Sequence, residues 1–94
     1  MALEFEWDGR KAEVNKRKHR VSFEEASTCF YDPFGLDFYD EDHSEGEDRY
    51  ILLARSNRER VLVVIYTERE GRIRIISARK ATPKEEEFYY AHRV

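Results

Sequence analysis

The sequence predicts an α+β domain in which helices pack against a small antiparallel sheet. Three runs rich in β-branched and aromatic residues follow one another at 50–56, 60–67 and 72–79, and the breaks between them are short and polar. Breaks of this length favour an antiparallel meander of neighbouring strands. Helix-start patterns precede and follow these runs. A chain of 94 residues is too short for two independent cores, so we expect one domain over 1–94.

Two helices are expected ahead of the sheet. A short extended segment, Phe5 to Trp7, precedes Asp8, which is a good N-cap for a helix over roughly residues 9–19. Ser22, followed three residues later by a glutamate, forms a capping box for a second helix. Pro33 ends that helix, because the residue before a proline is driven out of the α region.

The remaining elements surround the three main strands. Residues 34–39 are expected as a short edge strand, and the acidic stretch 40–49 as an exposed loop. The run VLVVIY at 61–66 is apolar at both parities, which predicts a central strand covered on both faces. Thr82 and Pro83 open a C-terminal helix with a second capping box.

The charge of the chain is unevenly distributed. The formal net charge is −3, yet residues 21–48 hold ten acids and no Lys or Arg, whereas residues 49–80 carry nine Lys or Arg against three acids. An acidic protein can therefore present a basic face, and an anionic partner responds to that local field.

Composition also indicates the cell compartment and the kinds of site to expect in this protein. Cys29 is the single cysteine, so an intrachain disulfide is excluded and a reducing, cytoplasmic setting is expected. We expect Cys29 to be a small buried hydrophobe. No apolar run approaches the roughly 18 residues of a membrane span, so no membrane association is expected. The acids around His43 fit no EF-hand spacing, so no metal or other cofactor is expected.

Several blocks of the sequence resemble one family of bacterial proteins, the BrnT toxins of BrnT/BrnA-type toxin–antitoxin pairs. The matching blocks are FEWD at 5–8, the pattern of Asn15, Lys18 and His19, VSFEEA at 21–26, Asp32-Pro33, DHSEGEDRY at 42–50, VLVVIYTER at 61–69 and IRIISARKAT at 73–82. The sequence departs from the family pattern at Ala54, where glycine is expected, and in the turn Glu70-Gly71.

This resemblance implies a RelE-like ribonuclease fold and a toxin that cleaves RNA without a metal, inhibiting translation and growth. It also implies neutralisation by a BrnA-like antitoxin encoded beside the toxin. That antitoxin would assemble the pair into a higher-order complex through its own dimer and would alone contact operator DNA.

Metal-independent cleavage of this class uses the 2′-hydroxyl of the RNA against the adjacent phosphate, so the protein supplies a base, an acid and cations. For the phosphate the candidates are Arg74, Arg79 and Lys80, because guanidinium groups donate paired hydrogen bonds to phosphate. His43 is the candidate acid and Glu68 the candidate base. The candidates for RNA binding are Arg49, Arg55, Arg72, Lys18, Lys11 and Tyr66.

Each candidate has a plainer alternative. The arginines are otherwise solvated or paired with the acids, Tyr66 is by default a core residue, and His19 completes a helix dipole. Strict alternation would place Arg79 with the isoleucines of its strand, so either the strand ends or a bulge intervenes near Ile76-Ser77. Our central expectation is that the arginines of the last two strands gather on one surface and hold a phosphate.

Two other functions stay open on sequence grounds. A non-catalytic module could bind nucleic acid or protein through the same basic sheet face. A metal-dependent hydrolase centred on His43 would instead lose all its activity in a chelator.

Overall fold

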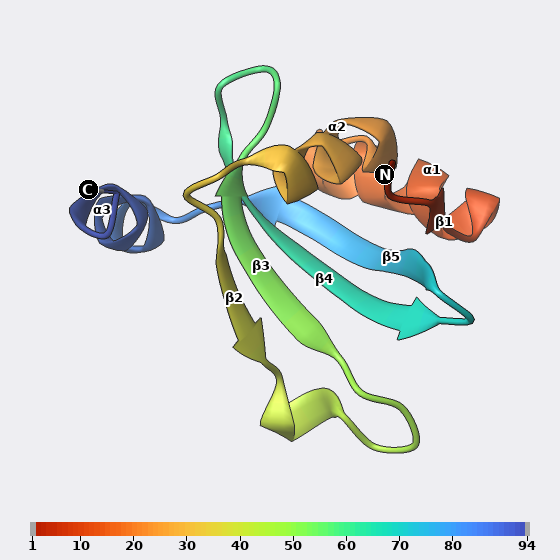
Figure 1. Cartoon of the computed structure of the whole chain (residues 1–94). Coiled ribbons are helices and arrows are strands. Elements are labelled where there is room, and N and C mark those ends of the chain that lie inside the picture. The colour runs from red at the N-terminus through yellow and green to blue at the C-terminus, as the bar shows by residue number, and fades with distance from the viewer. Residues whose placement is uncertain (1, 94) are drawn as a thin grey trace.

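The computed structural model describes residues 2–93 as one sheet and three helices (Figure 1). The elements in chain order are β1 (Phe5–Glu6), α1 (Gly9–His19), α2 (Phe23–Thr28), β2 (Leu36–Tyr39), β3 (Tyr50–Arg55), β4 (Val61–Arg69), β5 (Arg72–Lys80) and α3 (Pro83–Ala91), with short 3-10 turns at Cys29–Tyr31 and Glu41–His43. The predicted α+β class is confirmed. In the part of the chain that the structure describes, no helix combines the length and apolarity that crossing a membrane requires.

The strands form a single sheet in the order β1-β5-β4-β3-β2. The meander of β3, β4 and β5 is antiparallel, and β4 lies at the centre, as its apolar sequence predicts. The sequence predicted an antiparallel, RelE-like sheet of three main strands with short edge strands, and the observed sheet differs from this in detail. It has five strands, and β1 pairs parallel to β5, so the sheet is mixed.

The two faces of the sheet carry different helices. The helices α1 and α2 lie together on one side, whereas α3 lies apart from them at the end of β5 (Figure 1). On the first side, here called the α1–α2 face, Val21 and Phe23 pack against Leu62 in the larger core. On the other side, the α3 face, Tyr89 packs against Leu53 in a smaller core.

The predicted caps are present at the starts of all three helices. The Asp8 carboxylate accepts hydrogen bonds from two backbone N–H groups of α1, and Thr82 forms a reciprocal capping box at α3. Ser22 caps α2 as expected, but Glu25 does not complete a capping box. Its buried carboxylate turns instead to the Ser56 hydroxyl, at 2.6 Å, and to the Arg60 guanidinium. Tertiary ion pairing therefore replaces the local cap.

A bulge in β5 decides which side chains share a face. Ile65 lies opposite Ser77 and Tyr66 opposite Ile75, so Ile76 is an extra residue in β5. Of the two alternatives that the sequence left open, an end of the strand or a bulge near Ile76-Ser77, the structure shows the bulge. After the extra residue the alternation shifts by one, and Arg79 therefore lies on the α3 face, as Arg74 does.

The acidic segment before β3 is more ordered than a plain exposed loop. Asp40 is buried, and its backbone N–H donates to the carbonyl of Arg49 at 2.8 Å. The Ser44 hydroxyl donates to the Asp40 carbonyl at 2.5 Å and accepts from the Arg49 N–H at 3.0 Å. These bonds hold the loop against the start of β3.

Candidate functional site

On its outer edge, the second half of β5 lies beside α1 and not beside another strand, because β1 pairs with β5 only at Ile73 and Arg74. Near this edge, side chains from α1, β5 and α3 border one hollow of about 180 Å³. Its lining residues are His19, Ile51, Val63, Ile65, Ser77, Ala78, Arg79 and Glu85. A helix end, a strand after its bulge and a second helix thus supply polar groups to one small space.

Arg79 and Glu85 form a two-pronged ion pair at this hollow. Nη1 and Nη2 of Arg79 donate to the two carboxylate oxygens of Glu85 at 2.8 and 2.9 Å. The hydrogen bond from Arg79 lowers the pKa of Glu85 to about 2, and the same bond raises the pKa of Arg79. With a further bond to the Lys80 carbonyl, three of the five N–H groups of Arg79 are engaged within residues 2–93, which leaves two for a ligand.

Asn15 fixes α1 against β5. Its buried side-chain amide donates to the Ala78 carbonyl at 2.8 Å and accepts from the Ala78 N–H at 3.1 Å, as a neighbouring strand would. A second bond from the amide goes to the Val21 carbonyl at 3.0 Å. His19 follows Asn15 by four residues, which is about one helical turn, so this clamp sets the position of the imidazole beside Ser77.

A second hollow, of about 380 Å³, adjoins the first along α1. It is lined by Arg10, Lys11, Val14, Asn15, Lys18, His19, Ile76 and Ser77, so the two hollows share His19 and Ser77. Across residues 2–93, no carboxylate lies within salt-bridge distance of Lys11 or Lys18. Positive charge that is not neutralised therefore concentrates on α1.

The sheet arginines, by contrast, are paired. Arg72 and Arg74 both approach the Glu6 carboxylate, at 3.7 and 2.8 Å. Arg55 pairs with Glu59 at 2.6 Å, away from the hollow.

The arginines were predicted to gather on one surface. They lie on one face of the sheet, but they do not line a common hollow. Arg74 and Arg79 lie on the same face, yet four intervening residues of strand, including Ile76 of the bulge, separate them by roughly 15 Å. Of these two, only Arg79 lines the hollow.

Two further candidates lie on the wrong side of the sheet. Lys80 is opposite the core residue Leu62, so it belongs to the α1–α2 face and does not join Arg79. Glu68 lies within β4 and not in the following turn, and its partner is Ile73, on the same α1–α2 face. Strand alternation therefore removes Lys80 and Glu68 from the hollow.

Tyr66 is a core residue, in agreement with the default prediction. Its ring stacks on Tyr50 with centroids 5.4 Å apart, and its hydroxyl donates to Asp37 at 2.6 Å. Burial raises the pKa of the Tyr66 phenol. Cys29 is also buried, and desolvation raises the pKa of its thiol to about 12, which suits a packing role.

His43 and Arg49 belong to the loop before β3, which lies at the other end of the sheet from α3 (Figure 1). The Nδ1 atom of His43 lies 3.1 Å from the Asp40 carboxylate, and the imidazole is largely exposed. Within residues 2–93, no three His, Cys, Asp or Glu side chains are grouped to hold a metal.

Three polar residues of the hollow were missing from the predicted site: His19, Ser77 and Glu85. His19 stood in the Asn15–Lys18–His19 pattern, which was the one available signal for it. Glu85 was recognised only as part of a capping box. Nothing in the sequence around Ser77 marks it as a site residue, because the bulge decides on which face of the sheet its side chain lies.

A sequence profile of the family described as "Ribonuclease toxin, BrnT, of type II toxin-antitoxin system" matches residues 7–85, which include every polar residue of the hollow. The chain belongs to the BrnT family. Membership of a type II toxin–antitoxin family implies that a BrnT protein has an antitoxin partner.

The fold of this BrnT chain is similar to a solved relative. The 1.1 Å crystal structure of the Brucella abortus ribonuclease toxin BrnT superimposes with a TM-score of 0.68 and 19% sequence identity, covering 86% of this chain and 99% of that one. No protein with a curated description matches the sequence.

Proposed function

We propose that this BrnT protein is an endoribonuclease that cuts RNA at the hollow between α1, β5 and α3. The observation that supports this most is the meeting of Arg79, Glu85 and His19 around one small space, beside the unneutralised lysines of α1. The reaction is attack of the substrate 2′-hydroxyl on the adjacent phosphate, with no metal or cofactor.

Arg79 holds the phosphate. Its two remaining N–H groups donate to phosphate oxygens, and the guanidinium stabilises the negative charge that grows in the pentavalent transition state. The Arg79 side chain is 41% exposed, so a ligand reaches it from solvent.

Glu85 is the base and His19 the acid. The Glu85 carboxylate is ionised at neutral pH and lies on the guanidinium that holds the phosphate, which places it near the attacking 2′-hydroxyl. As the phosphate draws Arg79 toward itself, Glu85 loses part of its strongest stabilising partner and becomes more basic. His19, in the same hollow, donates a proton to the leaving 5′-oxygen.

Lys11 and Lys18 hold the flanking phosphates. They lie on α1 in the adjoining hollow, which continues past His19 and Ser77. RNA would therefore run along the outer edge of β5 and not across the paired arginines of the sheet.

We further propose that the protein acts in the cytoplasm, where cleavage inhibits translation and growth. A BrnA-like antitoxin silences it by covering charged groups of the toxin. Operator DNA is contacted only by the antitoxin, whose dimer assembles a higher-order complex.

The decisive experiment is incubation of the purified chain with RNA in a chelator. Cleavage is expected, with 2′,3′-cyclic phosphate ends, and replacing the 2′-hydroxyl at the cut site by 2′-O-methyl should abolish it. The Arg79→Ala variant should lose roughly 10²- to 10³-fold in kcat. Arg69→Ala is the matched control, because Arg69 also forms an ion pair, with Glu47, but outside the hollow.

Binding of RNA without any cleavage would instead support the non-catalytic module. Cleavage that Arg79→Ala leaves intact while Arg69→Ala impairs it would contradict the proposed site.

A further inference from the structure

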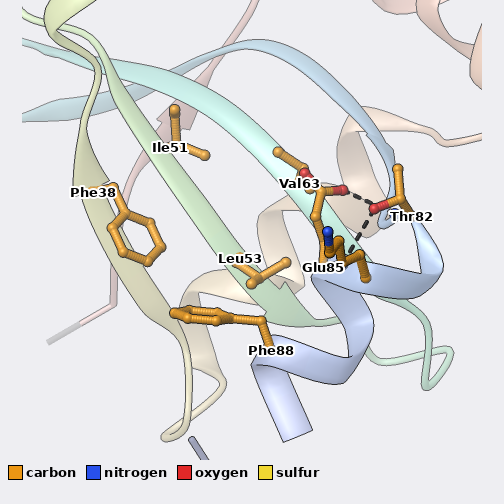
Figure 2. Close-up of a pocket in the computed structure, with 8 residues that line it drawn as sticks. Phe38, Ile51, Leu53, Val63, Thr82, Glu85 and Phe88 are labelled. Carbon is orange, nitrogen blue, oxygen red and sulfur yellow. Dashed lines mark hydrogen bonds between the residues drawn. The ribbon is translucent and has the colours of Figure 1, made fainter. Parts of the chain in front are cut away.

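An apolar groove lies between α3 and the sheet, next to the hollow of Arg79. It has a volume of about 500 Å³ and is lined by Phe38, Ile51, Leu53, Val63, Thr82, Lys84, Glu85 and Phe88. Figure 2 shows the two phenylalanines on the same side as Leu53, with Glu85 and Thr82 at the other end of the groove.

The walls of this groove leave large apolar groups in water. Phe38 and Phe88 are each 43% exposed, and their ring centroids lie 6.4 Å apart. The floor beneath them is formed by Leu53 and Val63, which are buried. An aromatic pair over an apolar floor is the composition of a protein–protein contact, and it is poorly suited to RNA phosphates.

The groove and the catalytic hollow are continuous. Ile51, Val63 and Glu85 line both of them. A protein segment seated in the groove would therefore lie against Glu85 and at the mouth of the hollow, where the RNA phosphate must enter.

The charges near the groove favour an acidic occupant. Lys84 lies on its rim, and within residues 2–93 no carboxylate is at salt-bridge distance from it. The other charged residue of the lining, Glu85, is neutralised by its ion pair with Arg79.

We infer that the groove receives an amphipathic segment of the antitoxin, which packs two or three apolar side chains against Phe38, Phe88 and Leu53 and places carboxylates near Lys84. This inference rests on the proposed function, because occupying the groove would silence the toxin by closing the hollow. The antitoxin would then bind at a surface distinct from the α1 lysines that we propose hold the RNA.

The test compares two neighbours on β2. Phe38 points to the α3 face, whereas Tyr39, with a similar exposure of 49%, points to the α1–α2 face. Phe38→Ser should weaken binding of the antitoxin roughly tenfold or more, while Tyr39→Ser leaves it unchanged. The antitoxin used is the protein encoded beside this chain, and its Kd is measured by titration calorimetry.

RNA cleavage is measured on the same samples. Phe38→Ser should cut RNA as the wild type does but should need correspondingly more antitoxin for inhibition. Lys84→Glu, on an exposed helical position, tests the groove without altering the core and should weaken binding most at low salt.

The possible failures are distinguishable. A wild-type chain that binds antitoxin through Phe38 but cuts no RNA would sink the proposed function and leave the docking surface standing. Unchanged antitoxin affinity in both Phe38→Ser and Lys84→Glu would overturn the docking surface. A dimer of the chain alone that Phe38→Ser dissociates would also overturn it, by assigning the groove to a second copy.

Discussion

At the scale of single residues, the extra residue Ile76 matters more than any charged group. It moves Arg79 from the α1–α2 face to the α3 face, where Glu85 can reach it. The ion pair then keeps the Glu85 carboxylate and the Arg79 guanidinium side by side, and each group stabilises the charged form of the other. A phosphate competes with Glu85 for the same guanidinium, which makes the pair both a support for α3 and the reactive centre that we propose.

The Glu85 pairing predicts a specific pH dependence of stability. The pKa of Glu85 falls from an ordinary value of 4.5 to about 2 in the folded state. A depressed folded-state pKa contributes stability that is complete above the unfolded pKa and is lost as the pH falls toward the folded one. The Tm advantage of the wild type over Glu85→Gln should therefore be full above about pH 5 and should vanish near pH 2.

Thermal unfolding from pH 2 to pH 7 measures this difference. Glutamine keeps the capping box with Thr82, so the variant removes the charge and not the helix start. Glu86→Gln, at the next position in the helix and exposed, is the control. Its Tm should differ from that of the wild type by an amount that does not depend on pH in this way. A pH-independent difference between the wild type and Glu85→Gln would contradict the pairing.

At the scale of elements, α1 lies along the outer edge of β5 beyond its short pairing with β1, where a further strand could otherwise pair. Asn15 uses its amide to satisfy both backbone groups of Ala78, 63 residues further along the chain. That contact brings the end of α1, with His19, to the hollow, while the capping box of α3 brings Glu85 to it from the other side. The site is therefore an assembly of three elements around one strand edge.

Asn15→Ala should consequently affect both stability and activity. It leaves the buried N–H and C=O of Ala78 without partners, at a cost of about 1–3 kcal/mol in the free energy of unfolding. It also frees the end of α1, so kcat/KM for RNA should fall more than roughly tenfold even in the folded fraction. Urea unfolding and cleavage assays well below the unfolding transition measure the two effects.

Glu13→Ala, on the exposed side of the same helix, is the control for Asn15→Ala and should change neither quantity much. A loss of stability with an unchanged kcat/KM would show that α1 is not part of the reactive site.

At the scale of the whole molecule, net charge is a poor guide to the partner. The chain is acidic overall, at −3, yet α1 carries five Lys or Arg residues against the single acid Glu13. The strand arginines are largely balanced by the ion pairs with Glu6, Glu59 and Glu85. The field that an RNA strand meets is therefore set by α1 and not by the sheet.

This distribution predicts the salt dependence of RNA binding. Removing Lys11 and Lys18 together should reduce the slope of log K against log salt by roughly 1.4, at about 0.7 per phosphate contact with a single strand. Fluorescence anisotropy with a 2′-O-methyl RNA measures binding without cleavage. The double variant Lys16→Ala/Arg17→Ala removes equal charge from the same helix away from the β5 edge, and should leave the slope nearly unchanged.

The sequence by itself determined the local elements. Asp8, Ser22 and Thr82 begin helices because a side chain caps the backbone within three residues, and the run at 61–66 is central because it is apolar at both parities. The breakdown of alternation at Arg79 predicted either a bulge or an end of the strand, and the structure has the bulge. These signals depend on neighbours along the chain, so they can be read without knowing the fold.

Only the tertiary structure decided which distant groups meet. The parallel pairing of β1 with β5, the clamp between Asn15 and Ala78, and the choice of carboxylate for each arginine depend on register between separate segments. In the sequence all these arginines look alike, and His19 looks like an ordinary helix end. Arg79 is distinguished because folding brings it, at one strand edge, to a carboxylate and an imidazole from two different helices.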